Sequence, residues 1–133
     1  MDDVGAITTI ASIIAGFGAA MLFFRIQREL QMAENLERIW IPVSDVLLIG
    51  ATLISLLLTL LPLMVIVPIP GFAPVRLARA SCAASILLLA GYVPSILAHY
   101  RIILGARRRG PRDNPEPAER TLAALTVSVA ALA

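Results

Sequence analysis

Three long apolar blocks limit what this chain can fold into more than any other feature of its sequence. They cover residues 4–24, 43–67 and 75–104, and the few charges of the last two blocks lie near their ends. The first block holds 21 residues. As a helix it measures about 31 Å, close to the hydrocarbon core of a bilayer at about 30 Å. We therefore expect an all-α integral membrane protein whose three transmembrane helices are these blocks.

The composition excludes several classes of protein. Hydrophobic residues make up 59% of the chain and charged residues 15%, whereas soluble domains hold about 45–50% and about 25%. Aromatic residues are 5%, too few to stack nucleic-acid bases beside the basic residues, so we expect no nucleic-acid partner. One cysteine and one histidine exclude an intramolecular disulfide and multi-cysteine or His-rich metal sites. Phosphate-binding loops and nucleophile elbows are missing as well. We expect no enzyme activity, no cofactor and no metal.

Residues 26–41, between the first two blocks, predict an amphipathic cytoplasmic helix. Leu36, Ile39, Trp40 and Val43 follow the spacing of one helix face, and charged residues fill much of the remaining surface. Such a helix can lie in the headgroup plane, pack on a partner, or continue the first span into water. Trp40 is typical of an interfacial anchor.

The last third of the chain changes composition twice. Residues 1–104 form the expected three-helix transmembrane domain, and residues 105–117 form a polar linker rich in arginine and proline. Residues 118–133 follow as a short apolar C-terminal helix. Its apolar part is too short to cross a bilayer alone. We expect it to be half-inserted or interfacial, unless the rest of a spanning helix comes from elsewhere.

The distribution of arginine predicts the orientation in the membrane. Arg76 and Arg79 lie at one end of the expected bundle, and the nine other arginines lie at or beyond the opposite end. Because cytoplasmic segments carry the excess of positive charge, we expect an outside N-terminus and a cytoplasmic C-terminal tail, in the inner membrane of a bacterium. Arg107, Arg108 and Arg109 can also bind anionic lipid headgroups, or act as a topology signal alone.

A stripe of small residues on the first helix predicts close contact with another helix. These residues, which we call the small-residue face, recur at every fourth position: Thr8, Ser12, Gly16 and Ala20. The pattern lets two helix backbones approach closely in lipid. Besides the lipid bilayer itself, we therefore expect as partners a second copy of the chain or other membrane subunits.

Polar residues on the second and third helices form another stripe, which we call the polar seam. Its members share one sector of each helical wheel: Asp45, Thr52, Ser55 and Thr59 on one helix, and Ser85, Tyr92, Ser95 and His99 on the other. Because the two helices run antiparallel, Asp45 and His99 lie at the same depth, where they can touch. The seam is either a polar path with a proton-linked pair, or a set of helix-packing hydrogen bonds in which Asp45 caps its helix.

These features leave two functions. The first is a non-enzymatic small polytopic membrane protein that acts through helix–helix assembly, as a homo-oligomer or as an accessory subunit of a membrane complex. The alternative is a homo-oligomeric ion channel or small transporter that uses the polar seam. A seam that faces a water-filled axis favours transport, whereas one that pairs inside a single chain favours assembly.

Overall fold

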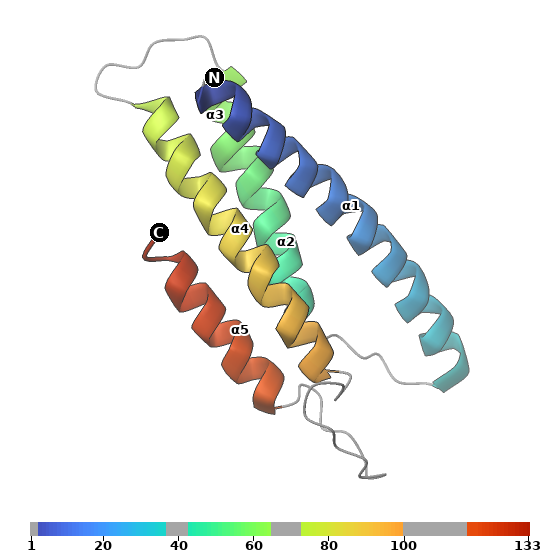
Figure 1. Ribbon diagram of the computed structural model, residues 1–133. Helices are drawn as coiled ribbons and strands as arrows, with labels where there is room; N and C mark the ends of the chain where they lie inside the picture. Colours follow the sequence, from blue (N-terminus) through green and yellow to red (C-terminus); the bar gives the residue numbers. More distant parts are fainter. Residues whose placement is uncertain (1–2, 37–42, 65–72, 100–116) are drawn as a thin grey trace.

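The computed structural model describes residues 3–36, 43–64, 73–99 and 117–133, and its ribbon is drawn in Figure 1. The side chains of residues 29, 32–36 and 99 are outside this description. Across these four ranges the chain forms helices and no strands, which confirms the all-α fold class. Three of the helical segments are long and apolar enough to cross a membrane: Asp3–Arg28, Ser44–Met64 and Pro74–Ala98.

The three candidate spans form an antiparallel bundle (Figure 1). The first span belongs to α1 (Asp3–Leu36). The second is a helical run of three parts: α2 (Ser44–Ile54), the π-helical η1 (Ser55–Leu60) and α3 (Leu61–Met64). The third is α4 (Pro74–His99).

A fourth helix, α5 (Pro117–Ala130), packs antiparallel to the C-terminal half of α4 (Figure 1). It also contacts α2, and within the described ranges it makes no contact with α1. The expected short C-terminal helix is therefore present, and it begins one residue earlier than predicted. It lies alongside the bundle and packs on α4 and α2.

The first span and the amphipathic segment are one continuous helix. α1 has 34 residues and measures about 51 Å, well beyond the hydrocarbon core of about 30 Å. Its C-terminal part extends away from the other helices (Figure 1). Of the three arrangements open to the amphipathic helix predicted over residues 26–41, the described part up to Leu36 continues the first span. Trp40, the linker from 105 to 116 and Arg107, Arg108 and Arg109 fall outside the described residues.

Small residues allow the helices to approach closely. Ala11 of α1, Ala51 of α2 and Ala78 of α4 are fully buried. A methyl group at Gly18 of α1 would collide with the hydroxyl oxygen of Thr52. Gly91 of α4 faces Thr126 of α5 in the same way. These contacts are typical of membrane helices, whose association depends on close packing because lipid already solvates apolar side chains.

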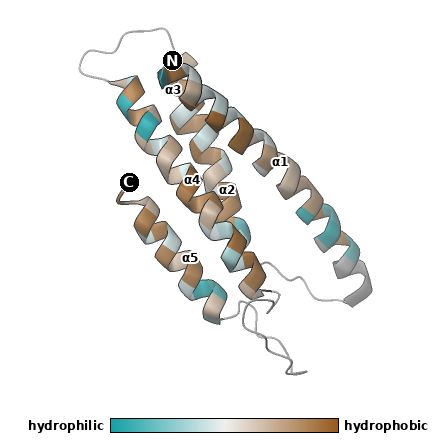
Figure 2. Ribbon diagram, in the orientation of Figure 1, coloured by the Kyte–Doolittle hydropathy of each residue, from teal (hydrophilic) through white to brown (hydrophobic). Residues whose placement is uncertain are grey.

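The outer surface of the bundle is strongly apolar. Hydrophilic residues gather toward the helix ends, and hydrophobic residues dominate between them (Figure 2). Large side chains such as Ile13, Leu57, Val93 and Leu125 are exposed. On a soluble protein so large an apolar surface would drive association. Here the apolar surface extends along the candidate membrane spans, where lipid would cover it. The described surface is therefore that of a membrane protein.

Candidate functional site

The polar seam is buried inside the bundle. Six of its eight predicted members are buried where α2 and η1 meet the other helices, and they are Thr52, Ser55, Thr59, Ser85, Tyr92 and Ser95. Asp45 is partly buried at the start of α2. His99 ends α4, and its side chain is outside the described part. Residues that share a sector of the helical wheel thus lie on one interior face, and the described members pack inside one chain.

Hydroxyl groups of η1 and α4 meet at the end of this seam that is farthest from Asp45. The Thr59 Oγ1 and Ser81 Oγ atoms are 2.9 Å apart, and either can donate to the other. Ser85 donates through its hydroxyl to the Ser81 carbonyl oxygen at 2.9 Å. We call Thr59, Ser81 and Ser85 the hydroxyl cluster. Ser81 shares the wheel sector of the predicted seam residues on α4.

The hydroxyl cluster lies against a defect in the second span. Pro62 has no N–H, so it cannot donate to the Leu58 carbonyl oxygen four residues earlier, as an α-helix requires. The Ser81 Oγ atom lies 3.0 Å from that carbonyl oxygen and 2.7 Å from the Leu77 carbonyl oxygen. Its single proton is donated to one carbonyl at a time. The π-helical η1 ends just before Pro62, and local π-helical turns are one way in which a membrane helix adjusts to a proline.

The other seam residues with hydroxyl groups are buried as well, and so is the neighbouring Ser44. Thr52 donates to the Leu48 carbonyl oxygen at 2.7 Å. The hydroxyl oxygens of Ser44, Ser55 and Ser95 are buried and have no hydrogen-bond partner among the described residues. These side chains lie between helices of one chain and are shielded from bulk solvent.

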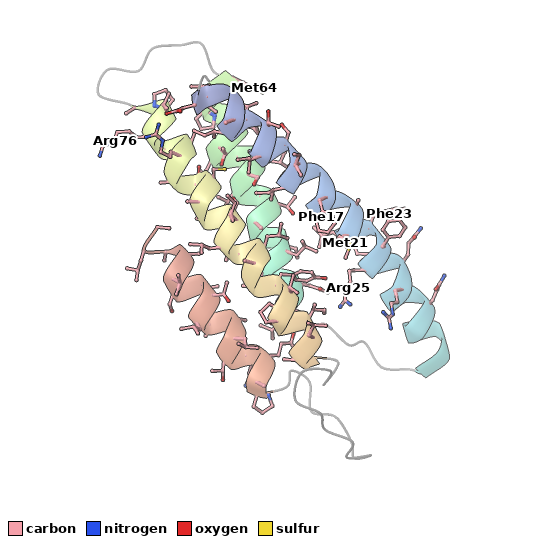
Figure 3. The ribbon with its side chains drawn as sticks, viewed as in Figure 1. Phe17, Met21, Phe23, Arg25, Met64 and Arg76 are labelled. Carbon is pink, nitrogen blue, oxygen red and sulfur yellow. The ribbon has the colours of Figure 1, made fainter. Side chains whose placement is uncertain are left out.

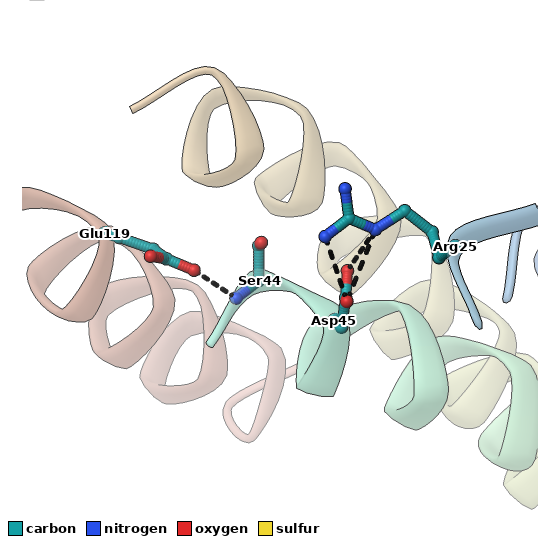
Figure 4. A network of polar contacts seen from close by, with 4 residues as sticks. All are labelled: Arg25, Ser44, Asp45 and Glu119. Carbon is teal, nitrogen blue, oxygen red and sulfur yellow. Dashed lines mark hydrogen bonds and ion pairs between the residues drawn. The ribbon is translucent and has the colours of Figure 1, made fainter. Parts of the chain in front are cut away.

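At the start of α2 the structure places a strong ion pair. Arg25 of α1 donates from Nε to both carboxylate oxygens of Asp45, at 3.1 and 3.3 Å, and from Nη2 to Oδ2 at 3.1 Å (Figure 4). Only 8% of the Arg25 side chain and 14% of the Asp45 side chain are exposed. Arg25 points toward the bundle, whereas Phe23 points away from it (Figure 3). The pair fixes the end of the first span to the beginning of the second.

A second polar contact joins α5 to the same end of α2. The Glu119 Oε1 atom accepts a hydrogen bond from the Ser44 backbone N–H at 2.7 Å (Figure 4). Glu119 is completely buried. The N-cap residue of α2, Val43, makes no side-chain cap, so a carboxylate from a distant helix satisfies this amide. A negative charge is also favourable at a helix N-terminus.

These two contacts, Arg25 with Asp45 and Glu119 with Ser44, form what we call the polar clasp. Sequence reasoning singled out Asp45 and missed its partner Arg25, which it used only in the charge count. The available signal was that Arg25 ends one apolar block and Asp45 begins the next, so opposite charges face each other at one depth. The expected contact between Asp45 and His99 stays a prediction, because the His99 side chain is outside the described residues.

The small-residue face of α1 lies on the outside of the bundle. Ser12, Gly16 and Ala20 are exposed and Thr8 is partly exposed. A Cβ atom at Gly16 would have no atom within 4 Å. The opposite side of α1 packs on the other helices, and Gly18 supplies its closest approach. The predicted face is therefore free to meet a neighbour in the membrane.

Comparisons were made with protein-family models, with curated proteins and with solved structures. None of them matches this chain.

Proposed function

We propose that the protein is a non-enzymatic membrane component that acts through helix–helix assembly, as a homo-oligomer or as an accessory subunit of a membrane complex. The observation that carries this proposal is the open surface at Gly16, between the exposed Ser12 and Ala20 on a candidate span. Small residues at four-residue spacing permit close backbone contact between membrane helices. Among the described residues, no other helix lies against this face at Gly16.

The burial of the polar seam favours assembly over the channel alternative. A homo-oligomeric channel needs polar side chains that face a water-filled axis. Here Thr59, Ser81 and Ser85 bond to one another and to backbone carbonyls inside one chain. Exposing them to a central pore would require the bundle itself to open.

The test of assembly is a substitution that fills the small-residue face. Gly16→Leu should dissociate the detergent-extracted particle, because the added side chain separates two backbones. Gly16→Ala should have a weaker effect. Ala80→Leu, an exposed small-to-large change on α4, is the matched control and should leave the particle intact. The measurement is particle mass by light scattering, together with identification of any copurifying subunit.

Two results would overturn this proposal. One is a wild-type particle with the mass of a single chain and no copurifying subunit. The other is an assembly that Gly16→Leu leaves unchanged, which would show that the face meets lipid.

We further propose the orientation that the arginine count predicts, with the N-terminus outside and the C-terminal tail in the cytoplasm. Arg25 and Arg28 lie at the end of the bundle opposite Arg76 and Arg79, and α5 enters from the Arg25 end as a half-inserted helix. A reporter fused after Pro115 should give a cytoplasmic signal. In a Cys82→Ser background, Gly71→Cys should react with an impermeant thiol reagent from outside. Reversed signals would overturn the orientation.

A further inference from the structure

An open groove runs between α2 and α5 on the outside of the bundle. Its volume is about 470 Å³. Apart from Arg120 and Ser128 its lining is apolar, and consists of Val43, Val46, Leu47, Ala123, Ala124 and Val127. It lies on α5, which does not contact α1 in the described ranges, so it is separate from the small-residue face.

Arg120 is the polar group of this groove that is available to a ligand. Its guanidinium makes no hydrogen bond or ion pair with the described residues, and it is exposed. The hydroxyl of Ser128 already donates to the Ala124 carbonyl oxygen at 2.9 Å. The neighbouring Glu119 is turned inward onto Ser44. One cation is therefore presented to the groove, and its remaining lining offers only apolar contact.

The position of Arg120 along the bundle is fixed by the polar clasp. Glu119 binds the first turn of α2, so Arg120 lies at the end of the second span, where the bilayer meets water. Val127 lies seven residues further along α5, or about 10 Å deeper. The groove thus runs from a charged mouth at the interface into the apolar layer.

We propose that the α2–α5 groove binds a glycerophospholipid, with an acyl chain along the groove and the phosphate on Arg120. The lipid complements the groove along its length. Its anionic phosphate would lie at the interface beside the cation, and its hydrocarbon chain would lie against the apolar lining. A guanidinium binds phosphate oxygens with two parallel hydrogen bonds. Basic pockets between membrane helices are a recognised type of site for anionic headgroups.

A second groove on the same protein provides an internal comparison. It lies between α1 and α4, has a volume of about 490 Å³, and is lined by Ile10, Ile13, Ile14, Ile86, Leu89, Ala90 and Val93. With no charged residue in its lining, it can hold hydrocarbon but cannot distinguish one headgroup from another. Selectivity for anionic lipid therefore belongs to the groove that contains Arg120.

The experiment measures lipid binding to the delipidated full chain by native mass spectrometry. The probes are phosphatidylglycerol and phosphatidylcholine with identical acyl chains. Wild type should bind phosphatidylglycerol more tightly. Arg120→Gln should weaken that binding about fivefold, the factor equivalent to about 1 kcal/mol for one basic residue near the surface. It should weaken the binding of phosphatidylcholine less, because the choline cation offsets the attraction of that phosphate to Arg120. Arg28→Gln, which removes the same charge at the same end of the bundle on α1, is the matched control and should change neither affinity.

Further variants separate the acyl chain from the headgroup. Ala124→Trp should fill the groove and weaken the binding of both lipids, and Ala124→Leu is the milder change if the first variant does not fold. Glycerol phosphate, which has the headgroup and no acyl chain, should fail to displace phosphatidylglycerol.

The proposal is overturned if Arg120→Gln keeps the preference for phosphatidylglycerol, or if Arg28→Gln lowers it equally. It is also overturned if glycerol phosphate displaces the lipid, because the site would then hold a phosphate without its chain. If Ala124→Trp converts a dimer to a monomer while lipid binding persists, a second copy occupies the groove instead.

Discussion

The hydroxyl oxygen of Ser81 lies 3.0 Å from the carbonyl oxygen of Leu58, the acceptor that Pro62 leaves without its usual α-helical donor. A proline inside a membrane span frees a backbone carbonyl where water is absent, and a serine or threonine side chain from a neighbouring helix is one group that can satisfy it. Here α4 provides that side chain. The contact explains why a serine lies at this point of the bundle, and it ties the irregular part of the second span to the third.

Replacing Ser81 with alanine should therefore destabilise the bundle. We expect Ser81→Ala to lower the free energy of unfolding by about 1–3 kcal/mol, the range for a buried polar group that loses its partner. The measurement is denaturant unfolding in detergent. Ser128→Ala, which removes an exposed hydroxyl bonded within its own helix, should have little effect.

A double-mutant cycle ties this loss to the proline. Pro62→Ala restores the missing N–H, so Ser81→Ala should cost less in the Pro62→Ala background than in the wild type. Additive losses would show that Ser81 acts without reference to Leu58.

The ion pair between Arg25 and Asp45 should contribute strongly to stability. Asp45→Asn removes a carboxylate charge that pairs with a mostly buried guanidinium, and such breaks cost about 3–5 kcal/mol when the pair is fully buried. Because both side chains retain some exposure, we expect a loss below that range. The measurement is thermal unfolding of the single variants and of the double variant with Arg25→Gln.

The cycle should show coupling between Arg25 and Asp45. The parallel cycle with Asp45→Asn and His99→Gln tests the contact that the sequence predicts. Additive effects in the first cycle would contradict the role that we assign to the pair, and additive effects in the second would show that His99 is independent of Asp45.

Removing the carboxylate of Glu119 should loosen α5. Glu119→Ala deprives the Ser44 amide of its acceptor, and a hydrogen bond to a charged group is worth about 1.5–3 kcal/mol. We expect faster hydrogen exchange at the Ser44 amide and along α5, with the α1 amides unchanged. Glu119→Gln keeps an acceptor and should show a smaller change.

Thr121→Ala is the control for this prediction. It removes an exposed hydroxyl that bonds only to the Pro117 carbonyl oxygen. Equal exchange rates in Glu119→Ala and Thr121→Ala would show that the cap does not hold α5.

Of two glycines two positions apart in α1, only Gly18 should be sensitive to substitution in the unfolding of the single chain. Gly18→Ala forces a methyl group into Thr52 and should lower the stability of the single chain by about 1–3 kcal/mol, as overpacking does. Gly16→Ala meets open space and should leave unfolding unchanged. Combining Gly18→Ala with Thr52→Ala should recover most of the loss, and failure to recover would point to a different contact.

The fold was predictable because the bilayer sets a length that the apolar blocks match. The burial of Thr59 and Ser85 followed from helical periodicity, which places polar residues of a span toward its interior. The side of α1 that faces the bundle was harder to predict, because Gly16 and Gly18 are equally small. They differ only in the structure, where Gly18 lies against Thr52 and Gly16 does not. The continuity of α1 past Arg25 was also open, since an amphipathic pattern is the same in a separate helix and in an extension.

The candidate site was less accessible to sequence reasoning. Glu119 and Ser44 are far apart along the chain, and no local pattern connects a lone acid in the last helix with an amide at the start of the second span. Likewise, the Leu58 carbonyl oxygen is open to Ser81 only because Pro62 has no N–H to donate to it. Which residue of α4 lies beside that carbonyl depends on how the two helices cross. Periodicity identifies a face of a helix, whereas these pairs depend on the tertiary arrangement.

The contact between Glu119 and Ser44 also sets an order of events during synthesis. The two residues are separated by 75 positions. At about 5–20 residues per second, the ribosome makes Ser44 roughly 4–15 seconds before Glu119. The second and third spans are therefore translated while the first amide of α2 still lacks its acceptor. The docking of α5 is therefore a late step in biogenesis. It supplies the acceptor for an amide at the start of α2 that Val43, the N-cap residue, does not bond through its side chain.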